Sequence, residues 1–256
     1  MIRIANLLSA DLNGLAHDLG ALLHSAAGQS AEVDGSAGIE DFRAGRVGVA
    51  LVCGLVYSRL HDATPERFAA VAAPVVDDPR GGGDAVYFSD IVVPADSVAR
   101  TLQDLSGTRF ACNEPVSFSG CRALEYELFR RGWGWDLFAE RIHTGYHRAS
   151  LEALAQGDAE AAAIDSHVLM LARRRDPELG GRIRILESLG PYPAPPVAIN
   201  TGSCGLSPER LTELLGGLPP GTLRRAGIRR WRRVDDAGYD PIRAVTRDLP
   251  GLDSLF

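Results

Sequence analysis

Strand-like and helix-like segments alternate along this chain from its first residues. An apolar run at residues 2–8 is followed by helical periodicity over residues 12–26, and a second apolar run covers residues 46–53. Such alternation is typical of α/β proteins, because each parallel strand needs a crossover, usually a helix, before its neighbour can be added. At 256 residues the chain is long enough for one large domain or for two lobes of ordinary size.

The alternation continues after a turn cluster at residues 77–83. We predict strands at 87–93, 109–112, 161–165, 182–188 and 197–200, and helices at 97–105, 122–131, 147–156 and 207–215. Residues 87–93 and 186–197 are interpreted as two crossings between lobes. Residues 1–90 with 188–256 would then form lobe 1 and residues 91–187 lobe 2, each a mostly parallel sheet with helices, with a ligand cleft between the lobes.

Composition excludes several classes of function. The net charge of -6 argues against nucleic acid as a partner. All 27 basic residues are arginine, so Schiff-base, pyridoxal-phosphate and Walker-type lysines are impossible. The four cysteines show no C-x-x-C pair, so we expect no metal site, and no cofactor motif is present.

The start of the chain and its cysteines indicate the cellular compartment of the protein. Four scattered thiols suit a reducing compartment, and the chain opens on a strand-like run rather than an export signal. No apolar run is long enough to cross a bilayer. As written, the chain is expected to be cytoplasmic, or periplasmic if the sequence has been trimmed.

The sequence Ser117-Phe118-Ser119-Gly120 lies between a predicted strand and a predicted helix. The first N–H groups of a helix lack internal partners, so a helix start with two hydroxyls suits phosphate, phosphonate or carboxylate. Gly120 would let the backbone come close to such an anion. The plain alternative is that Ser117 is only an N-cap.

Four other residues occupy positions where strands end or helices begin. Tyr57 follows Gly54 after an apolar run, Tyr87 begins a crossing, His147 opens a helix after Gly145, and Asp165 ends a buried strand. Each residue can also be explained without a ligand. Tyr57 could be a core tyrosine, Tyr87 an aromatic residue of a strand, His147 a surface or capping histidine, and Asp165 the N-cap of the next helix. We expect His61 and His143 to face solvent.

The order of these pieces resembles the phosphate, phosphite and phosphonate substrate-binding proteins of ABC transporters, which have the two-lobed type II periplasmic-binding fold. The resemblance covers nearly the whole chain and is carried by Gly54 to Tyr57, Tyr87 to Ser97, Leu105 to Ala111, Ser117 to Gly120, Gly145 to His147, Ala161 to Ser166, the proline-rich crossing, and Val234 to Arg243.

The resemblance implies roles for the matching residues. Ser117 and Ser119 with His147 would bind the anionic head of a ligand, while Tyr57, Tyr87 and Asp165 would face its other end. The family commonly has Thr at the position of Phe118, so the turn here lacks a hydroxyl and gains an apolar wall. This departure predicts a ligand other than bare phosphate.

The leading prediction is therefore a solute-binding protein that captures a small anion and performs no chemistry, with an ABC permease as partner if it is exported. The first alternative is a cytosolic enzyme on the same fold, favoured by Cys53 near the cleft and by the Asp165 and His167 pair. An intracellular sensor is a third, less favoured alternative.

Overall fold

The computed structural model describes residues 1–28, 30–247 and 249. Contacts divide the chain into two compact units: unit 1 contains residues 1–86 and 193–243, and unit 2 contains residues 87–192 with the described residues from 244 onward. The predicted lobes differ from these units at 87–90, at 188–192 and from 244 onward. The lobe boundaries stay a prediction.

Unit 1 contains a six-stranded sheet in the order β11-β4-β10-β3-β1-β2. Its strands are β1 (Ile2–Asn6), β2 (Ala31–Val33), β3 (Val49–Leu51), β4 (Phe68–Val76), β10 (Val197–Asn200) and β11 (Ile228–Arg233). Strand β1 is parallel to β2 and β3, whereas β10 is antiparallel to β3 and β4, and β11 is antiparallel to β4. The sheet is therefore mixed, because strands from the end of the chain enter it in the opposite direction.

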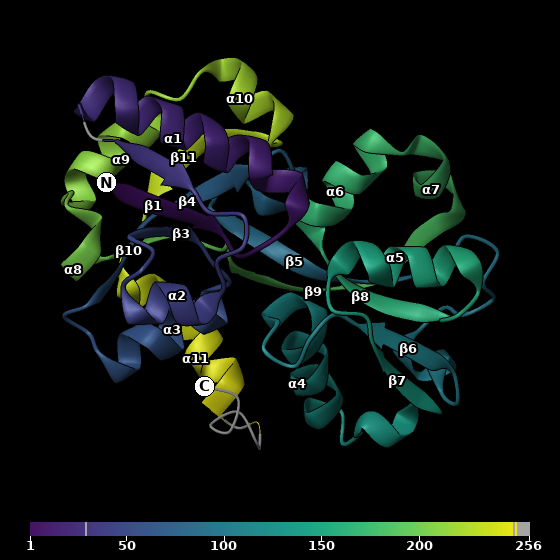
Figure 1. The fold of residues 1–256 in the computed structure, drawn as a ribbon. Coiled ribbons are helices and arrows are strands. Elements are labelled where there is room, and N and C mark those ends of the chain that lie inside the picture. Colours follow the sequence, from purple (N-terminus) through teal and green to yellow (C-terminus); the bar gives the residue numbers. More distant parts are fainter. Residues whose placement is uncertain (29, 248, 250–256) are drawn as a thin grey trace. The chain divides into compact units, whose positions relative to one another are not determined.

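Helices cover both faces of this sheet. They are α1 (Asn13–Ala27), α2 (Ile39–Ala44), α3 (Gly54–Ala63), α8 (Thr201–Cys204), α9 (Pro208–Gly216) and α10 (Pro220–Arg225), with short 3-10 turns η1 (Ala10–Leu12), η2 (Pro79–Gly81) and η6 (Asp236–Tyr239). Helix α11 (Asp240–Arg247) begins in unit 1 and ends in unit 2. Figure 1 shows α1, α9 and α10 on one side of the sheet and α2 and α3 on the other. The start of α3 packs closely, since a Cβ at Gly54 would lie 2.6 Å from Ile242 Cδ1.

Unit 2 contains a five-stranded sheet in the order β7-β6-β8-β5-β9. Its strands are β5 (Val86–Pro94), β6 (Arg109–Cys112), β7 (Glu140–His143), β8 (Ala161–Asp165) and β9 (Ile183–Pro193). Strand β6 is parallel to β7 and β8, and β5 is antiparallel to β8. The fold class, an α/β protein with two sheets flanked by helices, is confirmed, with strand directions more mixed than predicted.

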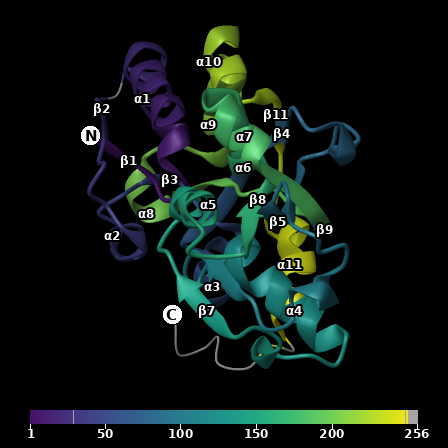
Figure 2. The same ribbon diagram turned by 90° about the vertical axis from the view of Figure 1, so that its right-hand side faces the viewer.

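The helices of unit 2 follow its strands closely. They are α4 (Ala123–Arg130), α5 (His147–Gln156), α6 (Ser166–Arg175) and α7 (Pro177–Arg182), with the π-helical turn η4 (Phe118–Arg122) and the 3-10 turns η3 (Leu102–Leu105) and η5 (Trp135–Leu137). Helix α5 packs on β8 (Figure 2), whose small residues Ala161, Ala162 and Ala163 are fully buried. Small side chains let a helix lie close to the sheet, so the predicted burial of this strand is confirmed.

One predicted helix is much shorter in the structure. Of residues 97–105, only Leu102–Leu105 form a helical turn. The Asp104 carboxylate accepts the backbone N–H groups of Arg100 and Thr101, which fixes the start of the turn late in the segment. Gly107, at φ 74°, follows soon after and does not continue the turn. None of the described helices has the length and apolar character that a bilayer crossing requires.

Candidate ligand-binding site

The loop after β6 becomes a helix at Ser117. Ser117 has an extended backbone, and its Oγ accepts the N–H of Gly120 at 3.1 Å, so the N-cap interpretation is correct. A hydroxyl that accepts a hydrogen bond still carries its own hydrogen, which can be donated. Turn η4 then continues into α4, so Ser117 caps a helical segment that runs from Phe118 to Arg130. Ser117 can therefore serve as a cap and as a donor to a ligand.

Gly120 is required here by a neighbouring side chain. A Cβ at this position would lie 1.4 Å from Asn113 Oδ1 and 2.4 Å from Asn113 Cγ, far inside van der Waals contact. Asn113 directly follows β6 and is buried at 6% exposure. Its Oδ1 has no hydrogen-bond partner among the described residues. Sequence reasoning attributed Gly120 to the approach of an anion, whereas its immediate function is to make room for Asn113.

His147 joins the same cluster from the start of α5. Its Nε2 lies 3.4 Å from Asn113 Nδ2, and its Nδ1 lies 3.5 Å from the backbone nitrogen of Asp165. Burial lowers the pKa of His147 to about 4, against a smaller opposing effect of a hydrogen bond with the Ala163 backbone. The imidazole is therefore neutral at pH 7 and buried rather than on the surface.

Asp165 ends β8 and caps α6. Its Oδ1 accepts the backbone N–H groups of His167 at 2.8 Å and Val168 at 3.2 Å, which confirms the capping alternative. Burial raises the pKa of Asp165 to about 7, the two backbone hydrogen bonds oppose this rise, and the Asp90 carboxylate adds to it. The hydrogen bond between the Asp165 carboxylate and the His167 backbone N–H is part of this cap.

The remaining loop residues face different neighbours. The Ser119 carbonyl accepts a hydrogen bond from Ser89 Oγ at 2.5 Å, which ties the turn to β5. The Phe118 ring is fully buried and packs edge-on against Tyr192, with ring centroids 4.8 Å apart. Tyr87, at the start of β5, is 1% exposed. Gly120 and His147 thus both contact Asn113, while Ser117 is hydrogen-bonded to Gly120 and the backbone of Asp165 lies beside His147. The Phe118 ring packs on Tyr192.

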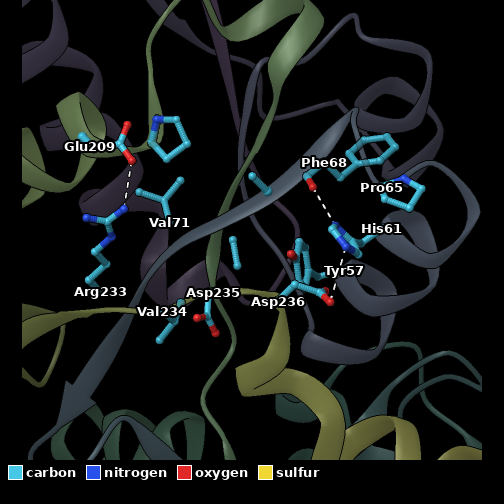
Figure 3. A pocket seen from close by; sticks show the side chains of 13 residues that line it. Tyr57, His61, Pro65, Phe68, Val71, Glu209, Arg233, Val234, Asp235 and Asp236 are labelled. Carbon is cyan, nitrogen blue, oxygen red and sulfur yellow. Dashed lines mark hydrogen bonds and ion pairs between the residues drawn. The ribbon is translucent and has the colours of Figure 1, made fainter.

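Tyr57 lies in unit 1, in a cavity of about 600 Å³ that is also lined by His61, Phe68 and Asp236 (Figure 3). Its ring packs against Tyr239 at a centroid distance of 5.0 Å. Burial raises the pKa of the Tyr57 phenol. The ring of Tyr57 is therefore buried among other side chains, as expected of a core tyrosine.

The prediction that His61 faces solvent is wrong. Its Nδ1 lies 2.8 Å from the carbonyl oxygen of Phe68, and its Nε2 lies 3.3 Å from Asp236 Oδ2 (Figure 3). These partners come from β4 and η6, so the pairing arises from the tertiary fold and leaves no local sequence signal. His143 is exposed, as predicted.

Asn113 is the site residue that sequence reasoning missed. A usable signal existed, because Asn113 is the first residue after a predicted strand and shortly precedes the Ser-Phe-Ser-Gly loop. Polar residues at the carboxyl ends of strands are the usual ligand-contacting positions of α/β sheets. The asparagine also explains why position 120 needs glycine, since the Asn113 side chain occupies the space beside it.

The family comparison decides how this geometry is interpreted. Residues 15–239 match the model for the periplasmic substrate-binding protein of phosphonate ABC transporters. The chain belongs to this family. Its members bind a substrate for a transporter, so this phosphonate-family protein has a ligand-binding role, and the comparison gives no support to the enzyme alternative.

Solved structures agree on the fold of this phosphonate-family protein. A binding component of an ABC phosphonate transporter from Pseudomonas aeruginosa has a TM-score of 0.80 at 16% identity, covering 95% of this chain and 84% of that one. PhnD1 of Prochlorococcus marinus, in complex with methylphosphonate, has a TM-score of 0.82 at 15% identity, covering 96% and 97%. The alkanesulfonate-binding protein of Xanthomonas axonopodis, bound to MOPS, reaches 0.59 at 17% identity, covering 95% and 83%. These likenesses establish the two-lobed binding-protein fold.

Proposed function

We propose that this chain is the periplasmic binding component of an ABC transporter and that it holds a small phosphonate-like oxyanion. The ligand would then be delivered to a permease partner. The family match supports the transport role. The proposed ligand-binding residues are Tyr57, Tyr87, Ser117, Phe118, Ser119, Gly120, His147 and Asp165, to which we add Asn113 because it contacts His147 and the Gly120 position.

The observation that carries this proposal is the polar cluster of unit 2. Ser117 has a hydroxyl hydrogen to donate, and Asn113 contacts both the Gly120 position and His147. His147 is neutral at pH 7, and the raised pKa of Asp165 leaves its carboxyl partly protonated there. An oxyanion therefore meets donors at a helix start without a full opposing negative charge.

Asp165 also suggests a feature of the ligand. A buried carboxyl with a pKa near 7 gains most from a nearby cation, since an ammonium group within about 4–6 Å would favour the ionised form. A phosphonate with an amino group would therefore bind better than a plain alkylphosphonate. We expect bare phosphate to bind less well, because position 118 holds an apolar phenylalanine and offers no hydroxyl.

Titration calorimetry tests this proposal with methylphosphonate, 2-aminoethylphosphonate, inorganic phosphate, methanesulfonate and acetate as probes. The two phosphonates should bind most tightly, with 2-aminoethylphosphonate ahead. A probe at about 100 times its dissociation constant should raise the free energy of unfolding by roughly 2.7 kcal/mol. No binding by any of the five anions would contradict the proposal.

Two serine variants separate binding from folding. Ser117→Ala should weaken phosphonate binding by about 10- to 150-fold, because a hydrogen bond to a charged group contributes roughly 1.5–3 kcal/mol. Ser207→Ala is the matched control, since Ser207 Oγ also caps a helix by accepting an N–H, that of Arg210 at 3.2 Å. Equal losses of affinity in both variants would place the ligand elsewhere.

A further inference from the structure

Two cysteines that are separate in the sequence meet in unit 2. Cys112 is the last residue of β6 and Cys121 lies in η4, and both side chains are almost fully buried, at 0% and 1% exposure. Their thiols share a side-chain hydrogen bond. All four thiols are free, as predicted. The loop between Cys112 and Cys121 folds back on β6, so these two thiols lie near each other although they are separate in the sequence.

The residues beside this pair report the same proximity independently. Asn113 and Gly120, the inner neighbours of the two cysteines, are in such close contact that a Cβ on Gly120 would overlap Asn113 Oδ1. Two adjacent pairs of residues thus face each other across the loop. Both cysteines are free in this structure, with no disulfide between them.

We propose that Cys112 and Cys121 form an intramolecular disulfide that closes the loop of residues 113–120. A bridge between the end of β6 and turn η4 would join two elements that are already in contact, and it would hold Ser117 and Ser119 in place. It would also fix the following segment, since the N–H groups of Thr144 and Gly145 donate to the carbonyls of Cys112 and Asn113. That segment leads directly to His147.

The two thiols differ in their readiness to react. The hydrogen bond from Cys112 lowers the pKa of Cys121, burial opposes this, and the nearby Arg122 and Arg141 guanidinium groups add to the lowering. The same hydrogen bond, together with burial, raises the pKa of Cys112. Cys121 is therefore the thiol that becomes a thiolate first, and the thiolate is the reactive form.

The reaction requires a small-molecule disulfide such as oxidised glutathione. The Cys121 thiolate attacks one sulfur of that disulfide, forms a mixed disulfide and releases one glutathione thiolate. The Cys112 thiolate then attacks the Cys121 sulfur and releases the second glutathione thiolate. The protein loses two thiol protons and two electrons, and the glutathione disulfide gains both as two thiols. Because both cysteines are buried, the reaction takes place during folding or when the loop opens.

The test is a peptide map of the full-length chain refolded in a glutathione redox buffer and then alkylated. Cleavage after Arg109 and Arg122 places both cysteines on one peptide, and chymotrypsin divides it after Phe118. We expect an unalkylated peptide that is two hydrogens lighter, and whose chymotryptic halves separate only after reduction. The same result is expected in Cys53→Ser and Cys204→Ser, and its loss in Cys112→Ser and Cys121→Ser. Alkylation of both cysteines in the wild-type chain, or a bridge that involves Cys53 or Cys204, would overturn the inference.

Hydrogen exchange measures whether the bridge restrains the loop. Backbone amides of residues 113–120 should exchange several-fold more slowly in the oxidised chain than in the reduced chain, and equal exchange would contradict the restraint. The bridge would favour ligand binding by restraining the loop, an effect that rests on the proposed function. Neither the peptide map nor the exchange measurement needs a ligand. A failure to bind any oxyanion would therefore contradict the proposed function, whereas the peptide map alone decides whether the disulfide forms.

Discussion

The helix starts at Ser117 and Ser207 use the same cap and differ in their first helical turns. In both, Oγ accepts the N–H of the residue three positions later, at 3.1 and 3.2 Å. After Ser207 come Glu209 and Arg210, both exposed and charged. After Ser117 every residue of the first turn is buried, and Asn113 and His147 lie beside it. A serine cap therefore indicates a helix start, and its neighbours indicate whether a ligand can use it.

The largest expected difference lies in the residue after the cap. Phe118→Thr should lower the free energy of unfolding by about 3–5 kcal/mol, because the ring is fully buried against Tyr192 and its loss leaves a cavity. Phe129→Thr, on the exposed side of α4 at 57% exposure, is the control and should cost far less. Denaturant unfolding monitored by fluorescence measures both.

Phe118→Thr also tests ligand choice. If the family residue at this position supplies a hydroxyl, the variant should bind methylphosphonate more tightly wherever it remains folded. Unchanged affinity in a folded Phe118→Thr protein would remove Phe118 from the proposed site.

The next difference concerns the glycines of the two helices. Gly120→Ala should cost about 3 kcal/mol, because its Cβ would overlap the Asn113 carboxamide. Gly216→Ala, in the helix that Ser207 caps, has nothing within 4 Å of the new Cβ and should be neutral or stabilising by about 0.5–1 kcal/mol. Urea denaturation of the two variants beside the wild-type chain measures both changes.

A double-variant cycle sharpens this glycine comparison. In Gly120→Ala with Asn113→Ala the collision is removed, so the pair should cost less than the sum of the single changes. Strict additivity, measured by chemical denaturation, would show that Asn113 does not set the requirement for glycine.

A smaller effect is expected from the two buried titrating groups. The native pKa of His147, about 4, lies below its usual value, so the unfolded chain binds more protons and stability rises with pH from about 4 to 6.5. The native pKa of Asp165, about 7, lies above its usual value, so stability falls as pH rises from about 4 to 7. The two effects oppose each other in the wild-type chain.

Removing one group should therefore reveal the other. His147→Asn should show stability that falls with rising pH, and Asp165→Asn stability that rises, each by on the order of 2 kcal/mol between pH 4 and 6.5. Thermal unfolding across this range is the measurement. Slopes of the same sign in the two variants would show that the groups do not titrate as described.

The smallest expected effect is the loss of the caps themselves. Ser117→Ala and Ser207→Ala should each lower the free energy of unfolding by about 1 kcal/mol, since the two hydrogen bonds are alike. Equal stabilities with unequal phosphonate affinities would assign the difference to the ligand. A much larger stability loss at Ser117 would instead show that this serine has additional structural contacts.

Local signals predicted much of unit 2. The strand at 109–112, the helix at 147–156 and the strand at 161–165 have the predicted bounds, because caps, glycines and runs of small apolar residues define their ends. The loop at Ser117 was predicted for the same reason. Its helix begins earlier than predicted, at Phe118, because a π-helical turn precedes α4.

Unit 1 was predicted less completely. Sequence reasoning overlooked β4, whose run Phe68–Val76 includes Pro74, and β11, where four of six residues are arginine. A proline and a row of charges are weak strand signals, and both strands are specified by pairing with each other. The contacts of His61 and Asn113 were also missed, because their partners are distant in the sequence and depend on the tertiary fold.

The strand order of unit 1 sets the order in which the chain can complete its folding during synthesis. Strand β4 joins β3 and the rest of its sheet only through β10, and its other edge is covered by β11. Both partners are translated more than a hundred residues after β4. The five strands of unit 2, by contrast, come from one continuous stretch of chain. A ribosome-bound chain would therefore carry an unfinished first sheet until its last fifth emerges.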